Sequence, residues 1–113
     1  MASRASTATR RFDRPGRLIP RPTGGLKARS VVLAAGGVMD WHSTHEREEL
    51  ILVLEGSVRI QIAGTKGAKR SLLLAAGKSL FLPAQTLHRV VNAARKPSRY
   101  VYVTGPSAET NRA

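Results

Sequence analysis

Histidine and glutamate are the residue types in this chain that are best suited to bind a metal ion. The chain has three histidines. His42 and His45 are separated by two residues, and His88 follows much later. The first pair is followed closely by three glutamates, Glu46, Glu48 and Glu49. Two or three imidazoles with one carboxylate suit Fe(II), Mn(II), Zn(II), Ni(II) or Cu(II). Because the chain has no cysteine, disulfides, thiolate catalysis and zinc-thiolate sites are excluded.

The strands expected around these residues direct the candidate ligands to one side. Glu49 has the same parity as Ile51, and His88 has the same parity as Val90 and Asn92. Residues of equal parity on a strand face the same side of a sheet. A barrel would bring two such strands together, so that imidazoles and a carboxylate converge inside an apolar cup.

Short apolar or alternating runs between glycine and proline breaks predict an all-β domain of seven to nine strands. The runs cover residues 17–20, 28–33, 49–55, 57–62, 70–75, 78–82, 87–92 and 98–104. The run 49–55 is apolar on both faces, whereas 57–62 alternates, with Val58, Ile60 and Ile62 expected in the core. Gly36, Gly56 and Gly77 are expected in turns that need unusual backbone angles. Residues 44–50 are the one local helix candidate.

The spacing of these residues resembles the two motifs of the cupin superfamily. The second motif is Gly, five residues, Pro-x-Gly, two residues, His, three residues, Asn. It is matched by "GKSLFLPAQTLHRVVN" at Gly77, Pro83, His88 and Asn92, with Gln85 in place of the motif glycine. In the first motif, six residues separate the glutamate from a glycine, which selects Glu49 before Gly56. The resemblance covers roughly residues 26–103 and implies a small jelly-roll barrel, the cupin double-stranded β-helix, with a metal in its mouth.

The first motif departs from the family pattern of His-x-His, because this chain has His42-Ser43-Thr44-His45. Either Gly37 opens the motif, with Ser43 and His45 at the two histidine positions, or Gly36 opens it, with His42 and Thr44 there. A β-bulge at Ser43–Thr44 would direct both histidines to one metal. We favour the bulge or the second alignment. The expected ligands of a divalent transition metal are therefore His42, His45, Glu49 and His88.

The resemblance also indicates candidate pocket residues, each with a structural alternative. Gln85 either faces the cup or replaces a turn glycine, and Asn92 either contacts substrate or holds a turn. Trp41 either walls the pocket or lies on the rim or at a dimer contact. The resemblance implies a small metalloenzyme with dioxygenase- or isomerase-like chemistry on a small molecule, or a non-catalytic binding or sensor protein. It also implies a homodimer.

The charge of the chain is strongly basic, at +12, and is concentrated near the N-terminus. Residues 1–30 hold eight Lys/Arg against Asp13 alone, a net +7, while residues 31–113 hold eleven against six, a net +5. We expect a disordered basic tail at 1–16, a barrel domain at 17–104 and a disordered tail at 105–113. Phe12 is the only aromatic residue in the tail, so specific nucleic-acid binding is not expected. No apolar run approaches a membrane span of ~20 residues, and we expect a soluble, cytoplasmic protein.

Overall fold

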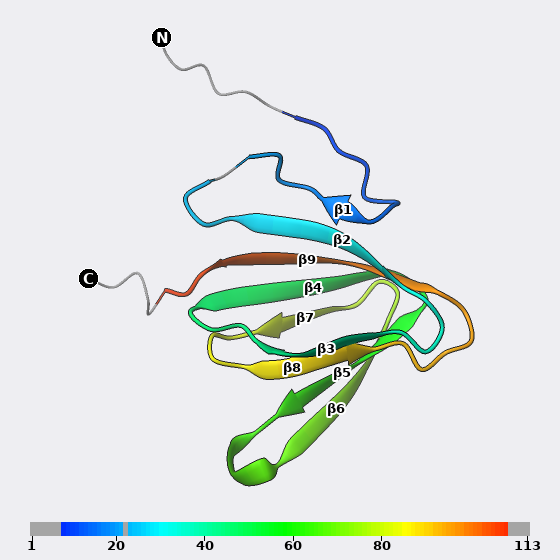
Figure 1. Ribbon diagram of the computed structural model, residues 1–113, viewed down its shortest axis with the longest axis vertical. Helices are drawn as coiled ribbons and strands as arrows, with labels where there is room; N and C mark the ends of the chain where they lie inside the picture. The colour runs from blue at the N-terminus through cyan, green and yellow to red at the C-terminus, as the bar shows by residue number, and fades with distance from the viewer. Residues whose placement is uncertain (1–7, 22, 109–113) are drawn as a thin grey trace.

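The computed structural model describes residues 8–21 and 23–108, and these residues fold as two packed antiparallel sheets (Figure 1). The described strands are β1 (Gly16–Arg17), β2 (Lys27–Leu33), β3 (Val38–Ser43), β4 (Arg47–Glu55), β5 (Ser57–Ala63), β6 (Lys69–Ala75), β7 (Ser79–Leu82), β8 (Leu87–Val91) and β9 (Ser98–Pro106). A single 3-10 turn, η1 (Thr65–Gly67), is the only helical element among the described residues. The all-β prediction is confirmed.

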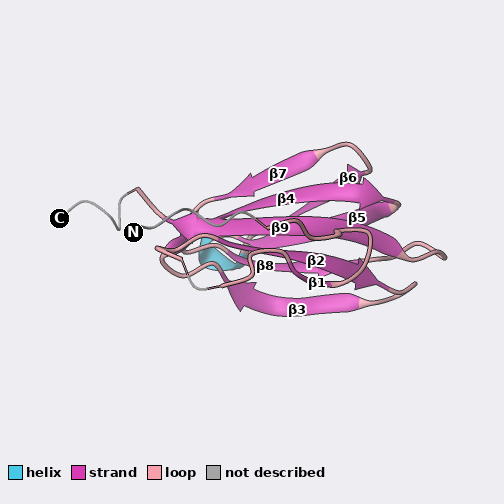
Figure 2. Ribbon diagram, turned by 90° about the horizontal axis from the view of Figure 1, so that it is seen from above, coloured by secondary structure: helices cyan, strands magenta, loops and turns pink. Residues whose placement is uncertain are grey.

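The larger sheet has the strand order β1-β2-β9-β4-β7, and the smaller has the order β3-β8-β5-β6. Seen from above, the strands of the two sheets run in roughly the same direction, and the helical turn lies toward one end of them (Figure 2). Consecutive strands β3 and β4 lie in different sheets, as expected of a jelly-roll barrel. The same end of the barrel therefore receives the end of β3 and the starts of β4 and β8 (Figure 1).

The core lies between the two sheets and is built by the inward-facing residues of both. It contains Val31, Leu33, Ile51, Val53, Val58, Ile60, Leu74, Leu82, Val90 and Tyr100. Ile62 and Tyr102 are partly buried and pack against it. The alternation predicted for 57–62 is thus confirmed. On β4 the two faces differ, because Ile51 and Val53 are buried whereas Leu50 and Leu54 on the outer face are exposed.

The glycines predicted in turns adopt left-handed backbone angles at Gly36, Gly56 and Gly77, with φ of 77°, 74° and 89°. The requirement is strictest at Gly56, between β4 and β5. A Cβ there would lie 2.7 Å from the Ser98 hydroxyl oxygen and 3.2 Å from the Pro97 carbonyl oxygen. Both the angle and the space therefore demand glycine at this turn between the two sheets.

The ends of the domain differ in detail from the predicted boundaries. The edge strand expected at 17–20 is the two-residue β1, and the last strand continues to Pro106. Part of the predicted N-terminal tail lies against the larger sheet, because the Ser30 hydroxyl donates to the Phe12 carbonyl and Arg99 donates to the Asp13 carbonyl. The remaining tail predictions, for residues 1–7 and 109–113, lie outside the described residues. No described helix is long and apolar enough to cross a membrane.

Candidate metal centre

His42, Glu49 and His88 come together at the mouth of the barrel, each from a different strand. His42 on β3 is directly opposite His88 on β8, and their ring centroids are 4.3 Å apart with planes tilted by 57°. Glu49 reaches them from β4 in the other sheet, with 3.8 Å between its Oε2 and His88 Nε2. One ligand atom from each of the three residues lies within 4.8 Å of the others. This spacing would allow all three atoms to bind one ion.

Backbone carbonyls orient both imidazoles. The Nδ1 of His42 lies 2.7 Å from the Asp40 carbonyl oxygen, and the Nδ1 of His88 lies 3.1 Å from that of Thr86. Because a carbonyl oxygen only accepts hydrogen bonds, each Nδ1 carries a proton, and in the neutral ring each Nε2 presents a lone pair. Metal-binding histidines in proteins are commonly held in this way, by a bond from the second ring nitrogen to a carbonyl or carboxylate.

The Nε2 atom of His88 is buried and has no hydrogen-bond partner among the described residues. The whole His88 side chain is 0% exposed. Its nearest charged neighbour, Glu49, is 8% exposed and stands at 3.8 Å, which is longer than a hydrogen bond. Buried polar atoms are normally paired, and an unpaired one costs about 1–3 kcal/mol. An ion bound by the three side chains would satisfy this atom.

The environment of His88 also changes its affinity for protons. Burial lowers the pKa of the imidazole, because it disfavours the charged form. The interaction with Glu49 and the hydrogen bond to Thr86 outweigh this effect, so the pKa of His88 is raised above its ordinary value of 6.5. A metal ion at Nε2 must therefore compete with a proton that Glu49 stabilises.

The register of β3 shows how the surplus residue of the first motif is accommodated. Met39 pairs with Val90 and His42 pairs with His88, so one extra residue is inserted at positions 40–41. The bulge predicted at Ser43–Thr44 is therefore wrong in position, because pairing continues regularly through Ser43 and the Thr44 amide donates to the Thr86 carbonyl. The second alignment fits this register, with His42 and Thr44 at the two motif positions.

His45, predicted as a fourth ligand, is not part of the three-residue group found among the described residues. It is exposed and lies in the turn after β3, in a left-handed conformation with a φ of 54°. Its amide donates to the Ser43 hydroxyl, and its carbonyl accepts from the Gln85 amide. At the position where the motif has histidine, the chain places Thr44, which is buried.

Thr44 joins the loop after β3 to the loop before β8. Its hydroxyl donates to the Pro83 carbonyl at 2.8 Å and accepts from the Thr86 amide at 3.0 Å. Thr86 in turn supplies the carbonyl that orients His88. Thr44 therefore braces both sides of the site, although it offers no metal ligand of its own. The sequence signal for this role was its place in the second alignment of the motif.

The candidate pocket residues have structural roles in the described part of the chain. Gln85 has a φ of 60°, which explains why the motif has glycine at this position. Asn92 is fully buried, and its amide donates to the carbonyls of Leu33, Ala34 and Lys96. Its side-chain oxygen accepts from the Ala94 amide. Asn92 thus holds the turn before β9, the alternative that the sequence had left open.

Trp41 lies in the bulge of β3, and its rings contact two cations rather than the group of His42, Glu49 and His88. The Lys69 ammonium and the Arg89 guanidinium lie 5.5 Å and 5.1 Å from the centre of its rings. Such cation–π contacts stabilise exposed sites by about 0.5–1 kcal/mol. These contacts link β3 to β6 and β8 within the smaller sheet.

Arg47 and Thr104 are mouth residues that the sequence reasoning missed. Arg47 shares the parity of Glu49 on β4, and Thr104 on β9 is directly opposite Glu49. The Arg47 guanidinium donates to the Thr104 hydroxyl at 2.8 and 3.0 Å, and it also donates to the Gly25 carbonyl. The parity of Arg47 was visible in the sequence, but the partnership with β9 required the sheet order.

Comparisons with known proteins agree with this architecture. The family profile described as the cupin domain matches residues 29–104. No curated protein matches the chain at a significant level. The Schizosaccharomyces pombe Cnp3 cupin domain superposes with a TM-score of 0.73 at 13% identity, covering 95% of this chain and 74% of that one. The TT1209 protein from Thermus thermophilus gives 0.68 at 22% identity, covering 87% and 90%.

Oxalate oxidases are also among the similar structures. A recombinant oxalate oxidase in complex with glycolate gives a TM-score of 0.71 at 18% identity and covers 93% of this chain but 59% of its own. Another oxalate oxidase structure is matched over only 42% of its length. At such identities the likeness shows the fold alone. The family profile, in contrast, spans more than half of the sequence, and the chain belongs to the cupin family.

Proposed function

We propose that the protein binds one divalent transition metal through His42, Glu49 and His88. The observation that carries this proposal is the buried, unpartnered Nε2 of His88, which faces a carboxylate and a second oriented imidazole. The donor set of two imidazoles and one carboxylate fits Fe(II), Mn(II), Zn(II), Ni(II) or Cu(II). With Thr44 in place of a further histidine, three protein ligands remain, so several positions of the ion stay open.

The proposed activity is a dioxygenase- or isomerase-like reaction on a small molecule. A metal held here would supply Lewis acidity and open positions for the reactants. The residues of the chain would supply the surroundings. Ile51, Leu82 and Val90 lie inward beside the three ligands and exclude water from the floor of the site. Its open side is at His42, which is exposed. Structural similarity to oxalate oxidases supports oxidative chemistry as the first to be tested.

A non-catalytic binding or sensor role is the second candidate. It is favoured because the residues near the site that could transfer a proton are already buried or hydrogen-bonded. Tyr100 is buried in the core. Burial and the charge of Glu49 raise the pKa of its phenol, so it stays protonated and does not act as a base. Arg47 is held by Thr104 and Gly25. Oxygen uptake by the metal-loaded protein with phenols, thiols or keto acids would favour the enzyme, and tight ligand binding without turnover would favour the sensor.

Elemental analysis of purified protein tests the metal proposal. We expect about one ion per chain in the wild type and almost none in His88→Ala or Glu49→Gln. His45→Ala is the matched control, because it removes an imidazole three residues from His42 that lies outside the group, and it should keep its metal. Wild-type protein that stays empty after incubation with Fe(II), Mn(II), Ni(II) and Zn(II) would refute the proposal.

We also propose that the protein is a homodimer that pairs through the outer face of the larger sheet. Leu50 and Phe81 are directly opposite partners on β4 and β7, and with Leu54 they leave an apolar surface exposed. Phe81 is 55% exposed. Light scattering should give twice the chain mass for the wild type and the chain mass for Phe81→Glu. Leu73→Glu, at a residue 59% exposed on the smaller sheet, is the control that should stay dimeric. A monomeric wild type would contradict the proposal.

A further inference from the structure

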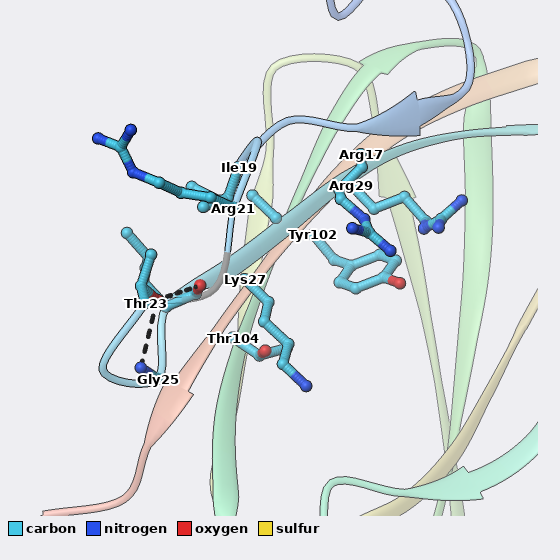
Figure 3. Close-up of a pocket in the computed structure, with 11 residues that line it drawn as sticks. Arg17, Ile19, Arg21, Thr23, Gly25, Lys27, Arg29, Tyr102 and Thr104 are labelled. Atoms are coloured by element: carbon cyan, nitrogen blue, oxygen red, sulfur yellow. Dashed lines mark hydrogen bonds between the residues drawn. The ribbon is translucent and has the colours of Figure 1, made fainter. Parts of the chain in front are cut away.

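A cavity lies beside the group of His42, Glu49 and His88, at the end of the larger sheet that is formed by β1, β2 and β9. Its volume is about 510 Å³, within the range of small-molecule sites. It is lined by Arg17, Ile19, Arg21, Thr23, Gly25, Leu26, Lys27, Ala28, Arg29, Tyr102 and Thr104. None of these residues is acidic, and the basic ones come from the chain segment between β1 and β2 and from the two strands themselves (Figure 3).

The basic residues that β2 contributes to this cavity lie on the face of the strand that forms the core further along the barrel. Lys27 and Arg29 have the same parity on β2 as Val31 and Leu33, which are buried in the core. Arg29 is directly opposite Tyr102, and Lys27 is directly opposite Thr104. Their side chains therefore share the inward side of the sheet. Figure 3 shows Lys27 beside Thr104 and the Arg29 guanidinium near the ring of Tyr102.

Two of these cations face each other without a counter-charge. Arg17 on β1 is directly opposite Arg29 on β2. Like charges in that arrangement destabilise a strand pair. The ion pairs among the described residues join Arg11 to Asp13, Arg99 to Glu55 and His88 to Glu49, and none includes Arg17, Lys27 or Arg29. Other basic residues of the sheets, such as Arg47, Arg89 and Lys69, do have partners. An anion between Arg17 and Arg29 would turn this repulsion into two charge-assisted bonds.

The geometry points to a binding site for a small organic molecule that carries at least two anionic groups. We infer this class of ligand because the positive charges of the cavity lie at two separate places. Lys27 and Arg29 are two residues apart on one strand, which places their Cα atoms about 6.6 Å apart. Arg17 and Arg29 bind one anionic group, Lys27 and Thr104 receive the second, and Tyr102 forms the floor between them. Guanidinium groups bind both carboxylate and phosphate groups through charge-assisted hydrogen bonds.

The cavity adjoins the metal group but does not depend on it. Thr104 lines the cavity and is directly opposite Glu49 in the sheet, and Arg47 bonds to both Thr104 and Gly25 of the lining. Neighbouring strands are about 4.8 Å apart, so a bound anion lies one strand from the candidate metal ligand. The inference goes beyond the proposed function, because it assigns a second site, and it can be tested without any metal.

Titration calorimetry at low salt on protein freed of metal with a chelating resin tests the site. The probes are citrate, succinate and pyrophosphate, with acetate and succinamide as singly charged and neutral comparisons. We expect saturable binding of the multivalent probes, weakened about tenfold or more by Arg29→Gln or Arg17→Gln. Arg95→Gln removes the same charge from an exposed loop, and its affinity should stay within about twofold. If the carboxylate probes bind more tightly than pyrophosphate, the site prefers carboxylate groups, and if pyrophosphate binds more tightly, it prefers phosphate groups.

Thermal unfolding supplies a second test, and a purely structural role of Arg29 would not produce the result expected here. Since Arg29→Gln removes the repulsion from Arg17, it should raise the melting temperature of the free protein while abolishing the rise that citrate causes in the wild type. Equal binding by wild type and Arg29→Gln, or no saturable binding of any multivalent probe, would overturn the proposal. So would a single-stranded oligonucleotide that binds in place of the small anions and still binds after Arg29→Gln.

Discussion

The two hydrogen bonds of the Thr44 hydroxyl, the Thr44 brace, lead to a quantitative prediction for both the stability and the metal affinity of the protein. Thr44→Val keeps the shape of a buried side chain but removes the hydroxyl that accepts from the Thr86 amide and donates to the Pro83 carbonyl. The Pro83 carbonyl retains a bond from the Thr86 hydroxyl at 2.8 Å, so the chief loss is the acceptor of one amide. An unsatisfied buried donor costs about 1–3 kcal/mol.

A loss of about 2 kcal/mol should lower the melting temperature of a domain of this size by about 8 °C. Metal affinity should fall about 10- to 100-fold as well, because the same bond fixes the loop whose Thr86 carbonyl orients His88. Circular dichroism on metal-free protein measures the first effect, and competition with a chelating dye measures the second. Thr86→Val is the comparison, because it removes a hydroxyl but leaves the Thr44 brace in place. Wild-type values for both quantities in Thr44→Val would refute this account of the brace.

Three further predictions concern single residues. Gln85→Gly should raise the unfolding free energy by about 0.5–1 kcal/mol in chemical denaturation, because Gln85 has a φ of 60°; a loss of stability would contradict this. Gly56→Ala should lower it by about 2–3 kcal/mol, because the angle is left-handed and the new Cβ meets Ser98. The raised pKa of His88 means that its contribution to the stability of metal-free protein is fully present below pH 6.5 and is lost as the pH rises through the raised value. Metal affinity should change in the opposite direction and fall on acidification. Comparing wild type with His88→Gln by denaturation between about pH 5.5 and 8.5 isolates this contribution.

The barrel was predictable because its strands alternate in the printed sequence. Val58 and Ile60 are buried as their parity predicts, and the turn at Gly56 needs the glycine that ends the first motif. Glu49 and His88 were selected by motif spacing and by parity, and both face the mouth. The position of the β3 bulge was not predictable, because the sequence 39–45 offers several places for one extra residue and only the pairing with β8 decides among them.

The basic cavity could not be read from the sequence for a different reason. Arg17, Lys27 and Arg29 read there as part of a basic N-terminal region, with nothing to separate them from their neighbours. Their convergence depends on the pairing of β1 with β2 and of β2 with β9, which joins residues more than 70 positions apart. The same sheet places Thr104 opposite Glu49, so the two proposed sites lie side by side on the larger sheet.

The most direct measurement of the central claim is an anomalous-scattering map of crystals loaded with Zn(II) or Mn(II). The account predicts one strong peak bonded to Nε2 of His42, Nε2 of His88 and a carboxylate oxygen of Glu49, at distances of about 2.0–2.2 Å. His45 should stand apart from the peak. An empty mouth in metal-soaked crystals, or an ion held by His45 without His88, would contradict the account.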